Sequence, residues 1–310
     1  MGVFFAIILY IFLLVFISFA FKKKNSHQEY FKGGNSSPWY VISIGMLGTS
    51  ISGVSFISVP AWVESTQFTY MQMVIGFFFG YMFVAYVLLP IYYKLNLISI
   101  YAYLKERFGN YSYKTASTFF ILSKSVSATV RICLVFLVLK TFILDKLVGI
   151  PIPFFILVLF FMFFIGLYTY RSGIKTIIWT DFIQTILFIT ALLLMIYHLT
   201  PLLNLQSLNS TYHLVATSEY AQMFEFKDWK SKQCFFKQFL SGIFVVIVMT
   251  GLDQDMMQKN LSCKNLKEAK KNMLTYGFLF IPINLLFLLL GALLLIYIRQ
   301  ENLALTMLGD

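Results

Sequence analysis

Apolar runs long enough to cross a lipid bilayer recur along the whole chain, and they constrain its fold more than any other feature. They lie at about 3–21, 40–61, 70–93, 115–143, 152–170, 176–199, 236–256 and 274–298. A helix needs roughly 20 apolar residues to cross about 30 Å of hydrocarbon. Because the 310-residue chain is also 59% hydrophobic and only 12% charged, we predict an all-α polytopic membrane protein with about eight transmembrane helices.

The basic residues predict how these helices are oriented. The first run has no basic residue before it, lacks a small-residue cleavage pattern and is followed by three lysines at 22–24. We interpret it as a retained helix whose C-terminal end is cytoplasmic. The loops that are then inside are 22–39, 94–114, 171–175 and 257–273.

Those inner loops carry 15 Lys and Arg, against seven on the outer side. Cytoplasmic loops are typically the richer in these residues, so the N-terminus and the C-terminus are both predicted outside the cytoplasmic membrane. The net charge of +11 is then explained by the membrane topology and by attraction of the basic loops to anionic lipid headgroups. We predict the lipid bilayer as a partner and no nucleic acid.

Residues that typically form metal centres or enzyme active sites are scattered. The three cysteines, Cys133, Cys234 and Cys263, match no metal or redox spacing, and the three histidines are equally far apart. The chain has no nucleophile elbow and no phosphate loop. We therefore predict no catalytic residues, no enzyme activity, no transition metal and no organic cofactor.

Ionisable residues inside the apolar runs are the first candidates for function. Each costs at least about 2.5 kcal/mol to insert, so such residues usually face a cavity or a partner. They are Lys124, Arg131, Asp181, Asp253 and Asp255. Lys124 and Arg131 share a helix face, which is either buried against neighbouring helices or lines a cavity. Asp181 either complements a helix dipole or binds an ion.

The stretch GMLGTSISGVSF (45–56) places small polar residues in the middle of an apolar run. If the helix breaks here, unwound carbonyls and Ser or Thr hydroxyls can coordinate a small cation, and glycine permits unusual torsions. The alternative is that Gly45, Gly48, Ser52 and Gly53 let two helices pack closely. Both interpretations fit the residues.

The stretch VVIVMTGLDQDMMQKNL (245–261) is a second interruption. Either the helix breaks near Thr250 and Gly251, or it ends at Met249 and the two aspartates are solvated. Five crossings separate the start of 40–61 from the start of 236–256, so the second copy would be inverted. An inverted five-helix repeat whose copies each begin with a discontinuous helix is typical of secondary transporters.

Three motifs give the chain a resemblance to the sodium/solute symporter family, over essentially its whole length. They are GGNSSPWYVISIGMLGTSISGVSFISVPAW (33–62), YRSGIKTIIWTDFIQ (170–184) and TGLDQDMMQKNLSCKNLKEAKK (250–271). The resemblance implies the leucine-transporter-type fold, a 5+5 inverted repeat. The domains would be a leading helix with a basic loop (1–39), the first repeat (40–199), an extracellular loop (200–235) and the start of the second repeat (236–310).

The resemblance also implies roles for individual residues. The carbonyls of Gly48 and Ile51 would bind sodium with Asp181, whose carboxylate a cation keeps ionised. The residues that would face the solute are Ser52, Ser55, Asp253 and Gln254.

The chain departs from the family pattern at four positions and in its length. Ser172, Ser58 and Ala61 replace common glycines, and Ser50 stands where some relatives carry an aspartate, which argues against proline-type coupling through that carboxylate. The chain stops at ENLALTMLGD, before the family's core helices eight to ten. We therefore expect a fragment of a longer product, or a truncated chain that does not transport alone.

The function implied by the resemblance is sodium-coupled symport of a small organic solute, such as a sugar, amino acid or carboxylate, by alternating access. The alternative is a non-transporting membrane sensor or structural module built on the same helices. A membrane enzyme with catalytic aspartates is the least favoured class.

Overall fold

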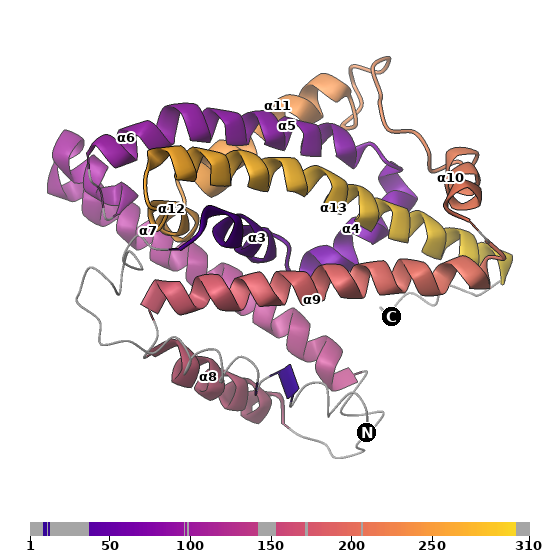
Figure 1. Cartoon of the computed structure of the whole chain (residues 1–310), viewed down its shortest axis with the longest axis horizontal. Helices are drawn as coiled ribbons and strands as arrows, with labels where there is room; N and C mark the ends of the chain where they lie inside the picture. The colour runs from indigo at the N-terminus through magenta and orange to yellow at the C-terminus, as the bar shows by residue number, and fades with distance from the viewer. Residues whose placement is uncertain are drawn as a thin grey trace. The chain divides into compact units, whose positions relative to one another are not determined.

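The computed structural model describes residues 9–10, 12, 37–95, 97, 99–141, 153–170, 173–205 and 207–301. These residues form helices and connecting loops, with no strand among them (Figure 1). The helices are α3 (Trp39–Ser50), α4 (Gly53–Thr66), α5 (Tyr70–Phe83), the π-helical turn η2 (Val84–Leu88), α6 (Leu89–Lys94), α7 (Ile100–Val138), α8 (Phe154–Tyr170), α9 (Gly173–Leu202), α10 (Leu208–Ala216), α11 (Phe235–Val246), the π-helical turn η4 (Ile247–Gly251), α12 (Gln254–Leu261) and α13 (Leu266–Gln300).

Six of the eight predicted crossings correspond to candidate membrane spans. Four are single helices, at Tyr70–Lys94, Ile100–Thr141, Ile174–Leu202 and Leu266–Gln300, and two are bent pairs, α3 with α4 and α11 with α12. The predicted run 152–170 corresponds to α8, whose 17 described residues are not among the candidate spans. The predicted run 3–21 lies almost wholly outside the described residues.

The described residues divide into two compact units. Unit 1 comprises the residues up to Met46 together with Leu89–Ile183 and Leu252–Asn272. Unit 2 comprises Leu47–Leu88, Gln184–Gly251 and the residues from Met273 onward.

Unit 2 is built on a close contact between α5 and α11, which lie side by side in Figure 1. A Cβ added at Gly76 would lie 2.2 Å from the carbonyl oxygen of Phe239, and one added at Gly242 would lie 2.3 Å from that of Met73. Two glycines thus let the backbones approach, as is common where van der Waals packing joins membrane helices. On α13, a Cβ at Gly277 would meet the ring of Tyr81 at 2.7 Å.

Unit 1 joins α12 to α6 and to α13 through buried polar contacts. The Tyr93 hydroxyl of α6 donates to the carbonyl oxygen of Asn260 at 3.0 Å. The side chain of Asn272 donates to Asn260 Oδ1 at 2.7 Å and to Met46 Sδ at 3.4 Å. Such contacts satisfy polar groups that an apolar environment would otherwise leave unpaired.

The helix α7 is longer than predicted, because the loop predicted at 94–114 is largely helical. Ser99 has extended torsions, and its hydroxyl accepts a hydrogen bond from the Tyr101 amide at 3.2 Å, which makes it the N-cap of α7. The helix bends at Gly109, where φ is 85°. Hydropathy alone misses the first turns because residues 100–114 are too polar to extend the apolar run.

Candidate functional site

The predicted discontinuity in 40–61 is confirmed as a break between α3 and α4. The two helices are bent by 65°, and only Ile51 and Ser52 lie between them. Gly48 is in the last turn of α3, where helix carbonyls lack intrahelical amide partners. The break therefore presents carbonyl oxygens, which are ligands that hard cations accept.

Two glycines of this stretch differ in how closely other atoms approach them. A Cβ at Gly45 would lie 3.1 Å from the carbonyl oxygen of Ile178 and 3.4 Å from Asp181 Cβ, so Gly45 lets α3 and α9 pack closely within unit 1. A Cβ at Gly53 would meet no atom within 4 Å. The close-packing interpretation is therefore confirmed at Gly45 and wrong at Gly53, the first residue of α4.

Ser52 and Ser55 lie at the start of α4 and are both partly exposed. Ser52 has extended torsions, and its amide donates to the Ser55 hydroxyl oxygen at 3.3 Å. This contact holds the Ser55 side chain over the first turn of α4. The start of α4 is thus a fixed and polar surface inside an apolar segment.

The second break separates η4 from α12, with a bend of 69°. Asp253 is the N-cap of α12, since its Oδ1 accepts hydrogen bonds from the amides of Asp255 at 2.9 Å and Met256 at 3.2 Å. A carboxylate is favourable there because it satisfies helix amides and complements the helix dipole. The helix does not end at Met249, and solvation of both aspartates in a loop is wrong for Asp253.

Two contacts fasten the start of α12 to α7 within unit 1. The Lys124 ammonium lies 2.7 Å from Asp253 Oδ2, with the two side chains 43% and 14% exposed. Gln254 Oε1 accepts a hydrogen bond from the Ile100 amide at 2.9 Å, one of the amides that the helix itself leaves unpaired. Arg131 is exposed, so the hypothesis of a polar face buried around both Lys124 and Arg131 is wrong.

Asp181 lies more than two turns inside α9, so its interpretation as a carboxylate at a helix start is also wrong. Its Oδ2 lies 2.7 Å from the ammonium of Lys259, which is almost fully buried. An ammonium taken out of water needs such a partner. Lys259 was not among the predicted site residues, because its run of the sequence reads as a basic cytoplasmic loop.

A chain of three hydroxyl groups in unit 2 also escaped the sequence analysis. The Tyr276 hydroxyl is hydrogen-bonded to Ser50 Oγ at 2.5 Å and accepts from the Tyr81 hydroxyl at 2.9 Å. Both tyrosines are buried. These hydrogen bonds connect the last residue of α3 with α5 and α13, so Ser50 helps to hold three helices together. Aromatic residues fill the apolar runs so densely that these two tyrosines gave no distinct signal.

The segment between α10 and α11 is tied to α5 within unit 2 by polar contacts. Gln72 donates to the carbonyl oxygen of Gln233 at 2.9 Å and accepts from the Glu225 amide at 3.1 Å. Glu225 in turn accepts from the Lys227 amide at 2.8 Å and the Asp228 amide at 3.3 Å. These hydrogen bonds, chiefly that from Lys227, hold the pKa of the Glu225 carboxyl below its usual value.

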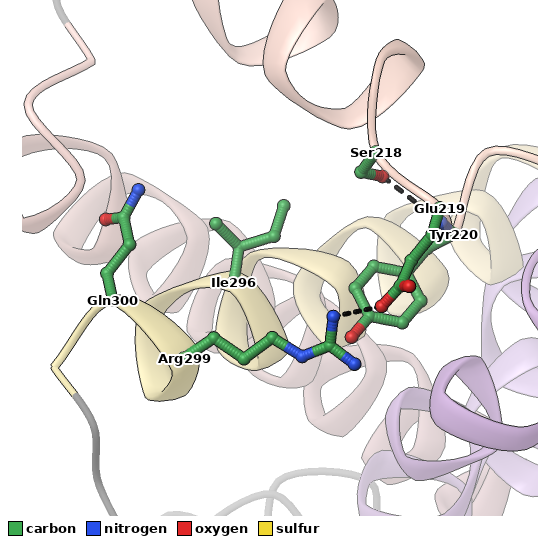
Figure 2. Close-up of a pocket in the computed structure, with 6 residues that line it drawn as sticks. All are labelled: Ser218, Glu219, Tyr220, Ile296, Arg299 and Gln300. Atoms are coloured by element: carbon green, nitrogen blue, oxygen red, sulfur yellow. Dashed lines mark hydrogen bonds and ion pairs between the residues drawn. The ribbon is translucent and has the colours of Figure 1, made fainter.

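Figure 2 shows an open pocket where the same segment meets the end of α13. The Arg299 guanidinium pairs with the Glu219 carboxylate and lies 5.3 Å from the centre of the Tyr220 ring. The pocket has a volume of about 390 Å³. Because the two charges are largely exposed and neutralise each other, water weakens their interaction.

The predicted site residues fall in both units. Gly48, Ile51, Ser52 and Ser55 belong to unit 2. Asp181, Asp253 and Gln254 belong to unit 1, where Lys259 and Lys124 bring positive charge to the two carboxylates. Whether these residues bind sodium and solute stays a prediction. Within the described residues, no three His, Cys, Asp or Glu side chains gather into a metal-binding group.

Comparisons with known proteins bear on the whole chain. The model of the sodium:solute symporter family matches residues 30–305. The sodium/sialic acid symporter SiaT of Proteus mirabilis is 26% identical over 297 residues, which cover 93% of this chain and 57% of that protein. The sodium/sialic acid symporter NanT of Aliivibrio fischeri is 26% identical over 290 residues, covering 90% of this chain and 54% of that one.

More distant similarity extends to the human sodium/iodide cotransporter, which is 21% identical over 248 residues, or 80% of this chain and 37% of that protein. The chain thus spans little more than half the length of the two bacterial relatives.

A solved structure of the substrate-bound outward-open state of a Na⁺-coupled sialic acid symporter superposes with a TM-score of 0.83 at 23% identity. The match covers 97% of this chain and 62% of that one, and it shows a shared fold. Together with up to six apolar candidate spans, two of which are broken helices, the family match leads to one conclusion: the chain belongs to the sodium:solute symporter family.

Proposed function

We propose that the protein is the part of a sodium-coupled symporter that carries the two broken helices, and that it moves a small organic solute by alternating access. The observation that carries this proposal is the pair of bends, 65° between α3 and α4 and 69° between η4 and α12. Membrane transporters use such interruptions to expose backbone polar groups to ions and substrates near the midplane.

The same bends support the proposed domain organisation. Each broken helix would open one five-helix repeat, the first over 40–199 and the second from 236 onward, with 1–39 as a leading helix and loop. The segment 200–235 would be extracellular, and the N-terminus would lie outside the cytoplasmic membrane. The excess of Lys and Arg in the predicted inner loops supports this orientation.

For sodium, we propose the carbonyls of Gly48 and Ile51 as neutral oxygen ligands and Asp181 as the charged one. Gly48 supports this role because it lies in the last turn of α3, and Asp181 because it is an ionisable residue inside a membrane span. Sodium binding would favour the outward-open state and so raise solute affinity, which is a coupling free energy between two sites.

For the solute, we propose Ser52, Ser55, Asp253 and Gln254 as contacts. The serines supply hydroxyl groups at the start of α4, and Gln254 supplies an amide. Asp253 would meet the solute while its two oxygens also face helix amides and Lys124. The names of the bacterial relatives mention sialic acid, so a sugar-like carboxylate is the first solute class to test.

The test is uptake of radiolabelled sialic acid and other small carboxylates into vesicles that contain the protein. Sodium should drive uptake, and potassium or choline should not. Asp181→Asn should raise the half-maximal sodium concentration roughly 10- to 150-fold, because a charge-assisted contact contributes about 1.5–3 kcal/mol. Asp228→Asn is the matched control, since Asp228 is an exposed loop residue. Uptake that is well above that of protein-free vesicles and is equal in sodium and in choline would refute sodium coupling.

A further inference from the structure

One lysine ammonium lies buried between two carboxylates in unit 1. Lys259, near the end of α12, has a side chain that is only 3% exposed, and its Nζ lies 2.7 Å from Asp181 Oδ2. The same Nζ lies 3.9 Å from Asp255 Oδ1, one turn earlier on α12. The Asp181 side chain is 20% exposed and that of Asp255 is 44% exposed. The ammonium therefore rests on the more buried carboxylate and has a second one within reach.

Burial makes a charged partner necessary for this lysine. An ammonium or a carboxylate that leaves water loses its hydration, and only an opposite charge or several hydrogen bonds can compensate. Lysine carries a compact charge on a flexible four-carbon chain. Its Nζ can therefore move between Asp181 and Asp255 by side-chain rotation, without displacement of α12.

Asp181 is also the carboxylate that the proposed function assigns to sodium. Sodium and ammonium carry the same charge, and two such cations beside one partly buried carboxylate repel each other strongly because the local dielectric is low. A sodium ion at Asp181 and the Lys259 ammonium at 2.7 Å are therefore alternatives.

We propose that Lys259 is an intramolecular competitor of the coupling cation at Asp181, and that Asp255 receives the ammonium when sodium binds. This inference rests on the proposed function. Sodium entry moves Nζ from Asp181 to Asp255, and no proton or covalent bond changes. The apparent affinity for sodium is then lowered by the fraction of molecules in which the ammonium occupies Asp181. Lys259 is thus a positioning residue that sets the sodium concentration at which the protein works.

Substitutions of the two partners of Asp181 should act in opposite directions. Lys259→Gln removes the competitor, so the half-maximal sodium concentration should fall at least about fivefold, the low end of typical coupling between ligands. Asp255→Asn removes the receiving carboxylate and keeps the ammonium on Asp181, so the half-maximal sodium concentration should rise by a similar factor. A pair that only stabilises the fold would leave the half-maximal sodium concentration unchanged or raise it in both variants.

The experiment is a sodium titration of the purified chain in detergent, followed by its unfolding temperature, with choline keeping the ionic strength constant. A ligand at concentration L that binds the folded state stabilises it by RT ln(1 + L/Kd), so fitting the rise of this temperature with sodium concentration gives the apparent dissociation constant, which equals the half-maximal sodium concentration. Lys264→Gln is the matched control, because Lys264 is exposed and the substitution removes the same charge. Its half-maximal sodium concentration should equal that of the unsubstituted protein.

Opposite shifts in Lys259→Gln and Asp255→Asn support the inference, as does a sodium response that appears only in Lys259→Gln. If the unsubstituted protein responds to sodium and Lys259→Gln responds equally or more weakly, the inference fails and the proposed function stands. If neither protein responds, sodium binding itself fails, and the inference fails with it. Should Lys259→Gln not fold, Asp255→Asn decides, because that variant keeps the ion pair between Lys259 and Asp181. An unchanged half-maximal sodium concentration in Asp255→Asn overturns the inference.

Discussion

At the scale of single residues, the Tyr276 side chain joins polar contacts from three helices within unit 2. Its buried hydroxyl connects Ser50 with Tyr81, and Tyr276→Phe would leave both hydroxyls without this partner. Each hydrogen bond contributes about 0.5–1.5 kcal/mol, so the loss of two should lower the free energy of unfolding by about 1–3 kcal/mol. Denaturant unfolding in detergent would measure it, with Tyr212→Phe as the control because Tyr212 is 69% exposed. Equal stability of the two variants would contradict this expectation.

Also at the scale of single residues, Glu225 should make the stability of its loop depend on pH. Its folded-state pKa lies below the usual value of 4.5, chiefly because the Lys227 amide donates to the carboxylate. The loop is therefore stabilised at neutral pH, and the stabilisation is lost as the pH falls below 4.5 through the lowered pKa. Hydrogen exchange at Lys227 and Asp228, corrected for the intrinsic pH dependence, should show protection at pH 6 that fades below pH 4. Glu225→Gln should abolish the pH dependence, and protection that persists unchanged to pH 3 would contradict the assignment.

At the scale of helices, the contact between α5 and α11 depends on two glycines. Gly76→Ala and Gly242→Ala would each place a Cβ within 2.3 Å of a backbone carbonyl oxygen, so one helix must move away. Overpacking of this kind typically costs about 1–3 kcal/mol, and the unfolding free energy should fall accordingly. Gly166→Ala in α8 is the control, because a Cβ there meets no atom within 4 Å. If all three variants were equally stable, the packing of α5 on α11 would be wrong.

The helices themselves were largely predictable, and their polar contacts were not. The length of the apolar runs identified 70–93 and 274–298. The small and polar residues near Gly48 and Gly251 identified both breaks, because a continuous helix in lipid is normally built from apolar residues. The first turns of α7 were missed because their signal is the N-cap Ser99 and not hydropathy. The pairs Lys124 with Asp253 and Lys259 with Asp181 join distant parts of the chain, and nothing in the local sequence specifies such partners.

At the scale of the whole molecule, the excess of positive charge in the inner loops predicts which loops meet the cytoplasm. We expect a membrane-impermeant maleimide added to intact cells to label Asp228→Cys and to leave Lys264→Cys unlabelled until the cells are opened. Both positions are exposed. The background should carry Cys133→Ser, because Cys133 is the exposed cysteine among the three.

The other two cysteines should contribute little labelling of their own. Both are buried, and burial raises the pKa of the Cys263 thiol to about 12, so almost none of it is the reactive thiolate at neutral pH. Labelling of Lys264→Cys in intact cells, with Asp228→Cys protected, would mean that the protein has the reverse orientation. The sodium gradient would then meet the opposite ends of the two broken helices, and the proposed order of binding from outside would have to be reversed.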